Sequence, residues 1–384
     1  MHSTTVSGSK EVPVPSRWSF ITTTKTLEEA CQVWVDNGVI GLDTEFVRET
    51  TYYPRPALIQ VAGCQGVSLI DPLELSDLDS LKAVLMAPAV VKVMHACDED
   101  LEVLELLTGG TVKNVFDTQL AASFTGYGFS MGYQNLVERL QGIVVDKTET
   151  RSNWLRRPLS PAQLRYAALD ATYLLPMHDR LLREIEAVGR SAWPNEELEH
   201  RRRARSGKNL LEAVYLRIRG RGKLTSEQRR VLRALCRWRE TEAAFRDMPR
   251  RHLLSDELLV KLAGVASADV ASLEDIQGLP TGIRTRYGQS LVTCIVQARS
   301  GRVDQTDTIV NLKPYSDQLD RLKSVVQRIA EAHNLPPELL ANRRMLEELV
   351  VSVVKQEETV PRKFLGWRFE LVTRVLLKNI CSLG

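Results

Sequence analysis

The segment from Val39 to Ile70 constrains this chain more than any other. An apolar run from Val39 to Leu42 is typical of a buried strand, and Asp43 and Glu45 stand two positions apart at its end. Side chains two apart on a strand project from the same face, so the two carboxylates repel each other unless a cation lies between them. Hard, oxygen-seeking ions such as Mg²⁺ or Mn²⁺ suit such a pair. A plain alternative is a strand that runs into a polar loop, and the pair alone leaves both interpretations open.

The apolar pattern of the first half predicts an α/β domain. We expect strands at residues 18–22, 39–44, 57–62, 67–70, 90–94 and 112–116, and helices at residues 26–35, 78–86, 98–107, 117–124, 134–140 and 161–178. The first strands follow one another through short connections, such as the tight turn at Gln65-Gly66, so the sheet is predicted to begin largely antiparallel. Strands and helices then alternate, which is typical of a mixed sheet with helices on its faces.

Length predicts more than one domain, because 384 residues exceed what a single core usually supports. In each half of the remaining chain a glycine, Gly278 or Gly366, precedes an apolar helix, which indicates two weakly similar helical modules. The stretch before them has mixed charge and little periodicity, so we interpret it as a linker. We therefore divide the chain into a flexible tail at residues 1–16, the α/β domain at 17–190, a linker at 191–210 and two all-helical domains at 211–302 and 303–384.

Composition excludes several classes of protein. No window approaches about 18 consecutive apolar residues, and the N-terminal stretch lacks an apolar core for export, so we expect neither a membrane span nor a signal peptide. The cytoplasm is therefore the expected compartment. The six cysteines are far apart and share no metal-ligand spacing with histidine, so they are predicted to be reduced side chains rather than zinc ligands or disulfides. Nothing in the composition indicates an obligate protein partner.

The positive charge of the chain is concentrated in one segment. The net charge is only +3, which by itself says little about partners. Residues 199–230, however, contain eleven Lys or Arg against three Glu, including the run Arg201-Arg202-Arg203. Such a block is either a solvated linker or a patch that attracts phosphate groups, and the sequence leaves both interpretations open.

Further acids and a phenol stand at positions where they can join the two acids of the first strand. Asp98 and Asp100 follow a buried strand at the start of a predicted helix, where Asp98 can cap the helix and Asp100 suits its positive end. Tyr166 and Asp170 are four residues apart on a later predicted helix, so they share a face. Asp170 stands among apolar residues and is predicted to be a buried charge that needs a cation.

The order of these groups matches an exonuclease superfamily that uses four acids and a tyrosine. Within it, the chain resembles the ribonuclease D family at Asp43-Thr44-Glu45-Phe46-Val47-Arg48, Tyr52-Tyr53-Pro54, Ala57-Leu58-Ile59-Gln60, Lys92-Val93-Met94-His95, Asp100-Leu101, Phe116-Asp117-Thr118-Gln119, Ser152-Asn153-Trp154 and Arg157-Pro158-Leu159. The helical half resembles the HRDC module, a nucleic-acid-binding domain shared with RecQ-type helicases, at Trp238-Arg239-Glu240, Asp247-Met248-Pro249 and Asp256-Glu257-Leu258-Leu259. The resemblance covers nearly the whole chain from Trp18.

This resemblance implies a ribonuclease H-like exonuclease domain, with a mixed sheet flanked by helices, followed by two HRDC-type helical bundles. It also implies a 3′-5′ exoribonuclease that trims 3′ extensions of transfer-RNA precursors and releases nucleoside 5′-monophosphates. Two divalent ions, Mg²⁺ or Mn²⁺, would be held by Asp43, Glu45, Asp100 and Asp170. Tyr166 would orient the attacking water, which assigns the chain to the tyrosine class of the superfamily.

Two sets of side chains near these motifs are hypothesised to touch RNA. Aromatic rings suit stacking on a terminal base, although they are equally suited to a core, and basic groups suit the phosphates. His95 and Asp117, in contrast, are interpreted as a buried strand-end residue and a helix cap. The candidates are Phe46, Tyr52 and Tyr53 for stacking and Lys147, Arg151 and Arg157 for phosphate contacts.

Two other functions compete with an exoribonuclease. Related catalytic domains act on DNA, and the contact to the ribose 2′-hydroxyl that separates RNA from DNA is not visible in a sequence. A non-catalytic RNA-binding scaffold is the second alternative. It is disfavoured because all five catalytic positions carry the residue types that the chemistry needs.

Overall fold

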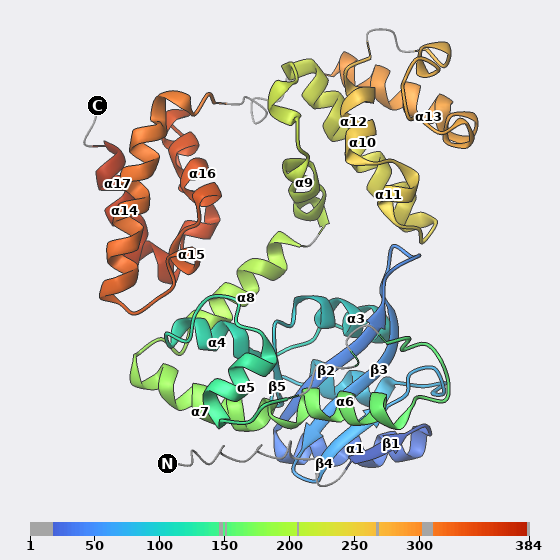
Figure 1. Cartoon of the computed structure of the whole chain (residues 1–384), viewed down its shortest axis with the longest axis vertical. Coiled ribbons are helices and arrows are strands. Elements are labelled where there is room, and N and C mark those ends of the chain that lie inside the picture. The colour runs from blue at the N-terminus through green and yellow to red at the C-terminus, as the bar shows by residue number, and fades with distance from the viewer. Residues whose placement is uncertain are drawn as a thin grey trace, which may run out of the picture. The chain divides into compact units, whose positions relative to one another are not determined.

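The computed structural model describes residues 18–145, 149, 152–205, 207–265, 269–301 and 310–381 (Figure 1). The chain forms two compact units. Unit 1 consists of Met1–Val47, Arg55–Glu199 and Pro314–Gly384, and unit 2 consists of Arg48–Pro54 and His200–Lys313. Unit 1 therefore combines the α/β part of the chain with its last helices.

A six-stranded sheet forms the centre of the α/β part, with the strand order β1-β4-β3-β2-β5-β6. β3 pairs antiparallel with both β2 and β4, whereas the β1–β4, β2–β5 and β5–β6 pairs are parallel. The mixed sheet with an antiparallel start, predicted from the short connections, is confirmed. The strands are β1 (Trp18–Ile21), β2 (Val39–Val47), β3 (Arg55–Gly63), β4 (Gly66–Ile70), β5 (Val91–Met94) and β6 (Val115–Asp117).

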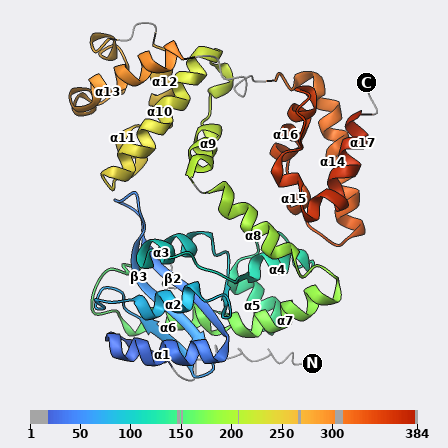
Figure 2. The ribbon, with the colours of Figure 1, turned by 180° about the vertical axis from the view of Figure 1, so that it is seen from behind.

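Helices cover both faces of this sheet. One face carries the main apolar core, in which Leu42, Ile59 and Val61 of the central strands pack with buried residues of α1, α2 and α3. α6 packs against β2, β3 and β4 and stands in front of the sheet in Figure 1, whereas α1 and α2 stand in front of it in Figure 2. The helices are α1 (Thr24–Asn37), α2 (Asp79–Met86), α3 (Asp98–Thr108), α4 (Thr118–Phe124), α5 (Tyr133–Gln141), α6 (Pro161–Thr172) and α7 (Leu174–Ala187).

A glycine in β2 allows α7 to approach the sheet closely. A Cβ atom added at Gly41 would lie 2.9 Å from the Cβ atom of Leu174 at the start of α7 and 3.2 Å from the Cβ atom of Ala62. Real Cβ atoms do not come that close to a neighbour, so a larger residue would push the helix away. Gly41 thus allows α7 to pack close to β2, the strand that carries Asp43. The end of α6, which precedes α7 directly, is held close to β2 as well.

Two helix boundaries differ from those predicted. α1 begins earlier than the predicted residue 26, because the side chain of Thr23 caps it by accepting a hydrogen bond from the Thr26 backbone N–H. The single helix predicted for residues 161–178 is divided at Tyr173 into α6 and α7. Pro176 explains the break, because its ring lacks an N–H group and clashes with the carbonyl of Thr172, four residues earlier.

The stretch predicted as a linker is helical. α8 (Trp193–Ala204) and α9 (Gly207–Arg217) occupy most of it, and Leu198 of α8 is buried. The Trp193 ring stacks on the Trp367 ring with centroids 5.2 Å apart, and Phe124 of α4 meets Trp367 edge-on at 4.9 Å. The last helices of the chain therefore pack on α4 and α8 within unit 1.

The helices after residue 200 fall into two groups, and beyond that point the described residues contain no strand. In unit 2 the longer helices share one apolar core, and Tyr52 of the Arg48–Pro54 segment packs against it. No helix among the described residues is long and apolar enough to cross a membrane. Unit 2 contains α9, α10 (Ser226–Phe245), α11 (Arg250–Leu253), α12 (Asp256–Ala263) and α13 (Thr281–Ser300), and the last group in unit 1 contains α14 (Ser316–Ala332), α15 (Pro337–Leu340), α16 (Arg343–Val354) and α17 (Arg374–Cys381).

Candidate active site

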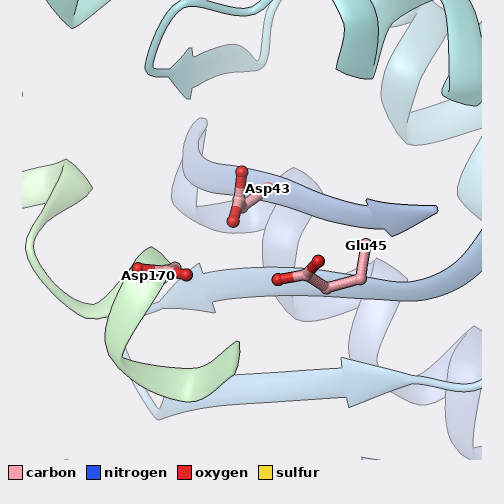
Figure 3. A group of neighbouring side chains, drawn as sticks. All are labelled: Asp43, Glu45 and Asp170. Carbon is pink, nitrogen blue, oxygen red and sulfur yellow. The ribbon is translucent and has the colours of Figure 1, made fainter. Parts of the chain in front are cut away.

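Three carboxylates from two distant elements meet on one face of the sheet, over the central strand β2. Asp43 and Glu45 lie on β2 and Asp170 lies on α6, and each offers an oxygen atom within 4.8 Å of those of the other two (Figure 3). The two-residue spacing puts the β2 acids on one face of the strand, as predicted from alternation. This is the face that α6 covers, so the helix brings Asp170 to them.

The start of α6 is fixed by its sequence. Ser160 and Gln163 form a capping box and Pro161 occupies the first turn, which together favour a helix that begins at this point. Tyr166 and Asp170 then lie one turn apart on the buried side. The side chains between them include Ala167 and Ala168, both fully buried, and their small size allows the helix backbone to lie close to the strands.

Asp100 approaches the same three acids from α3. The Thr44 Oγ1 hydroxyl donates a 2.5 Å hydrogen bond to Asp100 Oδ1, and the charge of Asp100 acts on both Asp43 and Glu45. Because successive strand residues face opposite ways, Thr44 points toward the α3 side while its neighbours point toward α6. Thr44 was not predicted as a site residue, although its position between the two acids is the signal that indicates it. Asp98, predicted to cap α3, is instead its first residue, after Cys97.

The pKa values of the four acids are all raised. Burial is the largest cause for each: it places the pKa of Glu45 at about 9, that of Asp170 at about 7 and that of Asp100 at about 6, and raises the pKa of Asp43 well above its usual range. Mutual repulsion among the carboxylates raises the pKa values of Asp43 and Glu45 further. Such acids ionise together when a cation offsets their charges.

The donor set suits a divalent cation. All four groups are carboxylates, which are hard oxygen ligands of the kind that Mg²⁺ and Mn²⁺ prefer. Asp170 Oδ1 is buried and has no hydrogen-bond partner among the described residues, so this oxygen is available to an ion. The group therefore combines the charge, the ligand type and an unused ligand atom that a metal site needs.

We expect the metal-free protein to lose stability as the pH rises from about 5 to about 9. Burial raises the pKa values of Asp100, Asp170 and Glu45 to about 6, 7 and 9 in the folded protein. At any pH between the pKa of an acid in the unfolded chain and its pKa in the folded protein, the folded state holds more protons than the unfolded state. The free energy of unfolding therefore falls with rising pH, by about 1.4 kcal/mol for each unit of pKa shift.

Urea denaturation at a series of pH values, with EDTA or with excess Mg²⁺, measures this effect. Mg²⁺ should remove most of the pH dependence, because bound metal favours the ionised carboxylates. A metal-free stability that stays level or rises between pH 6 and pH 9 would contradict the burial of these acids.

Tyr166 is buried beside Asp170. Its side chain forms a hydrogen bond with the Asp170 carboxylate, which lowers the pKa of that acid against the larger effect of burial. The Trp154 ring packs against the Tyr166 ring, with centroids 6.0 Å apart. The fully buried Tyr133 was not predicted as part of this region, yet Asp170 and Asp43 are near enough to raise the pKa of its hydroxyl beyond the effect of burial. No spacing in the sequence indicates this proximity.

The predicted aromatic contacts have different environments. Tyr52 belongs to unit 2, where its hydroxyl lies 3.3 Å from Glu240 Oε2 and its backbone N–H donates to Asp247. We therefore correct the prediction for Tyr52 to a structural role, because its ring and hydroxyl are engaged inside the protein. Tyr53 is 39% exposed and Phe46 is half-buried on β2, so stacking by these two rings stays a prediction.

Arg157 has a structural role in place of the predicted phosphate contact. Its Nε and Nη2 groups donate to the two carboxylate oxygens of Asp71 at 2.5 and 2.7 Å, and Nη2 also donates to the Ala57 carbonyl. Nη1 donates to the carbonyls of Trp154 and Arg156. All five N–H donors are thus used within the protein, and none is left for a phosphate.

The remaining basic and polar candidates are Lys147, Arg151, Asp117 and His95. Lys147 and Arg151 lie outside the described residues, so their predicted phosphate contacts stay predictions. Asp117 caps α4, because its carboxylate accepts hydrogen bonds from the backbone N–H groups of Gln119 and Leu120, and this interpretation is confirmed. The His95 ring makes hydrogen bonds to Thr118 and to the Met131 carbonyl. Both residues support the fold around α3 and α4.

Comparison with known families divides the chain into three matching regions. A 3′-5′ exonuclease family matches residues 18–186, an HRDC domain family matches residues 228–295, and the C-terminal HRDC domain of ribonuclease D matches residues 314–376. The first region contains all four acids and Tyr166. Members of this exonuclease family use divalent metal ions, in agreement with the acidic cluster.

Whole proteins of known family match over nearly the full chain. Ribonuclease D of Granulibacter bethesdensis is 36% identical over 374 residues, which cover 94% of this chain and 92% of that protein. Ribonuclease D of Escherichia coli is 32% identical over 365 residues, which cover 94% and 97%. The crystal structure of the Escherichia coli enzyme superposes with a TM-score of 0.84 at 31% identity and covers 96% of this chain and all of that one. This chain therefore belongs to the ribonuclease D family of 3′-5′ exoribonucleases.

Proposed function

We propose that this exoribonuclease trims 3′ extensions from transfer-RNA precursors and releases nucleoside 5′-monophosphates. The observation that carries the proposal is the convergence of the half-buried Asp43, Glu45 and Asp170 carboxylates, with Asp100 and the buried Tyr166 beside them. The similar Escherichia coli enzyme is described as an exoribonuclease involved in structured RNA processing, and transfer RNA is a structured RNA. The free cysteines among the described residues suit the reducing cytoplasm, where we propose that the enzyme acts.

Two divalent ions, Mg²⁺ or Mn²⁺, are proposed to occupy the carboxylate cluster. Asp43, Glu45 and Asp170 would hold one ion, because their oxygens converge within 4.8 Å. Asp43 would also contact the second ion together with Asp100, whose charge acts on Asp43. Bound there, the ions would lower the pKa of the attacking water and offset the charge that develops on the phosphodiester.

Tyr166 is proposed to orient the water for attack in line with the leaving 3′ oxygen. Its hydroxyl is anchored by the hydrogen bond to Asp170, and its ring is held against Trp154. An ordinary tyrosine pKa near 10 makes the phenol a poor base at neutral pH, so a hydrogen-bonding role suits it better than proton abstraction. Attack forms a bond from the water oxygen to phosphorus and breaks the bond to the 3′ oxygen, which leaves as the new 3′-hydroxyl.

The remaining candidates are proposed to hold the RNA end. Phe46 and Tyr53 would stack on terminal bases, and Lys147 and Arg151 would meet phosphates. The basic stretch at residues 199–230 supports a nucleic-acid substrate, because clustered positive charge attracts the phosphate backbone. RNA is favoured over DNA by the family to which the chain belongs.

Digestion of a transfer RNA with a 3′ extension by the full-length protein tests this proposal. We expect Mg²⁺-dependent shortening from the 3′ end, with nucleoside 5′-monophosphates identified by mass spectrometry and no product in EDTA. A single-stranded DNA of matched sequence serves as the control substrate and should be degraded at least about tenfold more slowly. Equal rates on both substrates, internal cleavage or 3′-monophosphate products would each refute the proposal.

A further inference from the structure

Gln60 on β3 carries a buried amide with no hydrogen-bond partner. Its side chain is 0% exposed, and neither Nε2 nor Oε1 has a partner among the described residues. Leaving such a group unpaired costs about 1–3 kcal/mol, so buried amides are nearly always paired. Gln60 is therefore a polar group whose partner has to be found nearby.

The register of the sheet places Gln60 next to the acidic cluster. Gln60 pairs directly with Asp43 across the β2–β3 ladder. Directly opposed residues of antiparallel strands project from the same face, with Cβ atoms about 4.5–5.5 Å apart. Their neighbours agree with this assignment, because Ile59 and Val61 pack in the core on the other face, whereas Ala62 lies beside the Cβ position of Gly41 on this one.

The carboxylates near Gln60 are acceptors in need of donors. Asp43 has Asp100, Asp170 and Glu45 as its charged neighbours, and a hydrogen bond from the Thr44 backbone favours its ionised form. An amide offers two N–H donors and carries no charge. A neutral donor can thus support a carboxylate here without competing with a cation for the site.

We propose that Gln60 is a positioning residue of the metal site, with its Nε2 group donating a hydrogen bond to the Asp43 carboxylate when divalent ions are bound. This inference rests on the metal site of the proposed function. Gln60 would hold one Asp43 oxygen in place so that the other faces the ions. Because Gln60 is fully buried, it acts through Asp43 and does not touch the RNA.

The variant Gln60→Met tests the proposal, because methionine has a similar length and volume and no N–H donor. Leu58→Met is the matched control: Leu58 lies two residues earlier on the same face of β3, is 0% exposed, and has no hydrogen bond to lose. Mn²⁺ affinity is measured by isothermal titration calorimetry on the full-length protein without RNA. The metal concentration for half-maximal activity and the turnover at saturating metal are measured separately.

We expect Gln60→Met to weaken Mn²⁺ binding about 10- to 100-fold, as the loss of a group that orients a metal ligand does. Turnover at saturating Mn²⁺ should stay within a few-fold of the wild type, and Leu58→Met should bind Mn²⁺ normally. The metal-free variant should be at least as stable as the wild type, because an unpaired amide is replaced by an apolar group.

Wild-type Mn²⁺ affinity in Gln60→Met would overturn the proposal, and so would failure of the variant to fold, because the amide would then be satisfied inside the metal-free core. Asp43→Asn separates this outcome from a failure of the proposed function. If Asp43→Asn binds Mn²⁺ as the wild type does, the metal site itself is wrong. If only Asp43→Asn loses the metal, the site stands and the role of Gln60 does not.

Discussion

Replacing Asp43 with asparagine is expected to reduce turnover by at least about 10³-fold, while the protein remains folded. The charges of Asp100, Asp170 and Glu45 all raise the pKa of Asp43, in addition to the larger effect of burial. Asparagine has nearly the same shape but no charge, so it holds a hard cation poorly. Loss of several kcal/mol of transition-state stabilisation from a metal corresponds to a rate reduction of about this size.

The same substitution separates catalysis from folding. In EDTA we expect Asp43→Asn to unfold at a higher temperature than the wild type, because it removes a buried carboxyl that repels its neighbours. In Mg²⁺ the order should reverse, because the metal stabilises only the protein that binds it. Single-turnover cleavage of a labelled RNA and thermal unfolding in both buffers measure the two effects.

Asp36→Asn is the matched control for this experiment. Asp36 is exposed on α1, which covers the other face of the sheet, so turnover and stability should both stay close to the wild type. An Asp43→Asn variant that keeps more than about a tenth of the wild-type turnover would show that the carboxylate does not hold a metal needed for the chemistry.

The acids of this site could be found from the sequence because they follow the backbone periodicities. Asp43 and Glu45 share a strand face at a spacing of two, and Tyr166 and Asp170 share a helix face at a spacing of four. In each pair the spacing alone determines that the two side chains point the same way, without reference to the rest of the fold. Asp100 lacks such a pair, and the resemblance rather than the spacing indicated it.

Contacts between residues far apart in the chain could not be predicted in this way. Arg157 and Asp71 are 86 residues apart, and a lone arginine inside a motif resembles a phosphate contact until its carboxylate partner is known. Tyr52 has the same difficulty, because Glu240 and Asp247 come almost two hundred residues later. In both cases a polar side chain that suits a substrate proved to be satisfied by the protein itself.

The helical structure of the predicted linker was missed for a related reason. α8 ends in the run Arg201-Arg202-Arg203 and has few apolar positions, so its own sequence shows little helical periodicity. Part of its buried face is covered by Trp367 and Arg368 from the last helical group. A segment whose burial depends on residues about 170 positions away carries too weak a local signal to be recognised.

Replacing Glu197 of α8 with alanine is expected to destabilise unit 1 by about 3–5 kcal/mol. Glu197 Oε2 accepts a 2.6 Å hydrogen bond from Arg368 Nη1, and the two side chains are only 9% and 6% exposed. Removing one partner of a buried ion pair leaves the other charge without compensation, and this loss is usually of that size. The other donors of Arg368 are held by the carbonyls of Leu339 and Leu340, so its guanidinium cannot turn away easily to reach water.

Denaturation in urea, followed at the first transition, measures this loss. Glu199→Ala is the control, because Glu199 is an exposed acid on the same helix and its removal should change the free energy of unfolding by about 0.5 kcal/mol or less. A loss of less than about 1 kcal/mol for Glu197→Ala would mean that the ion pair does not hold the last helices on α8.

A double variant identifies the cause of the loss. Glu197→Leu combined with Arg368→Met replaces both charges by apolar groups, and buried ion pairs exchanged in this way are often no less stable than before. The double variant should therefore recover most of the stability that Glu197→Ala loses. The double variant keeps the stacked Trp193 and Trp367 rings. A recovery would therefore show that Glu197→Ala loses stability because the charge of Arg368 is left uncompensated. Loss of packing between α8 and the last helices would not be the cause.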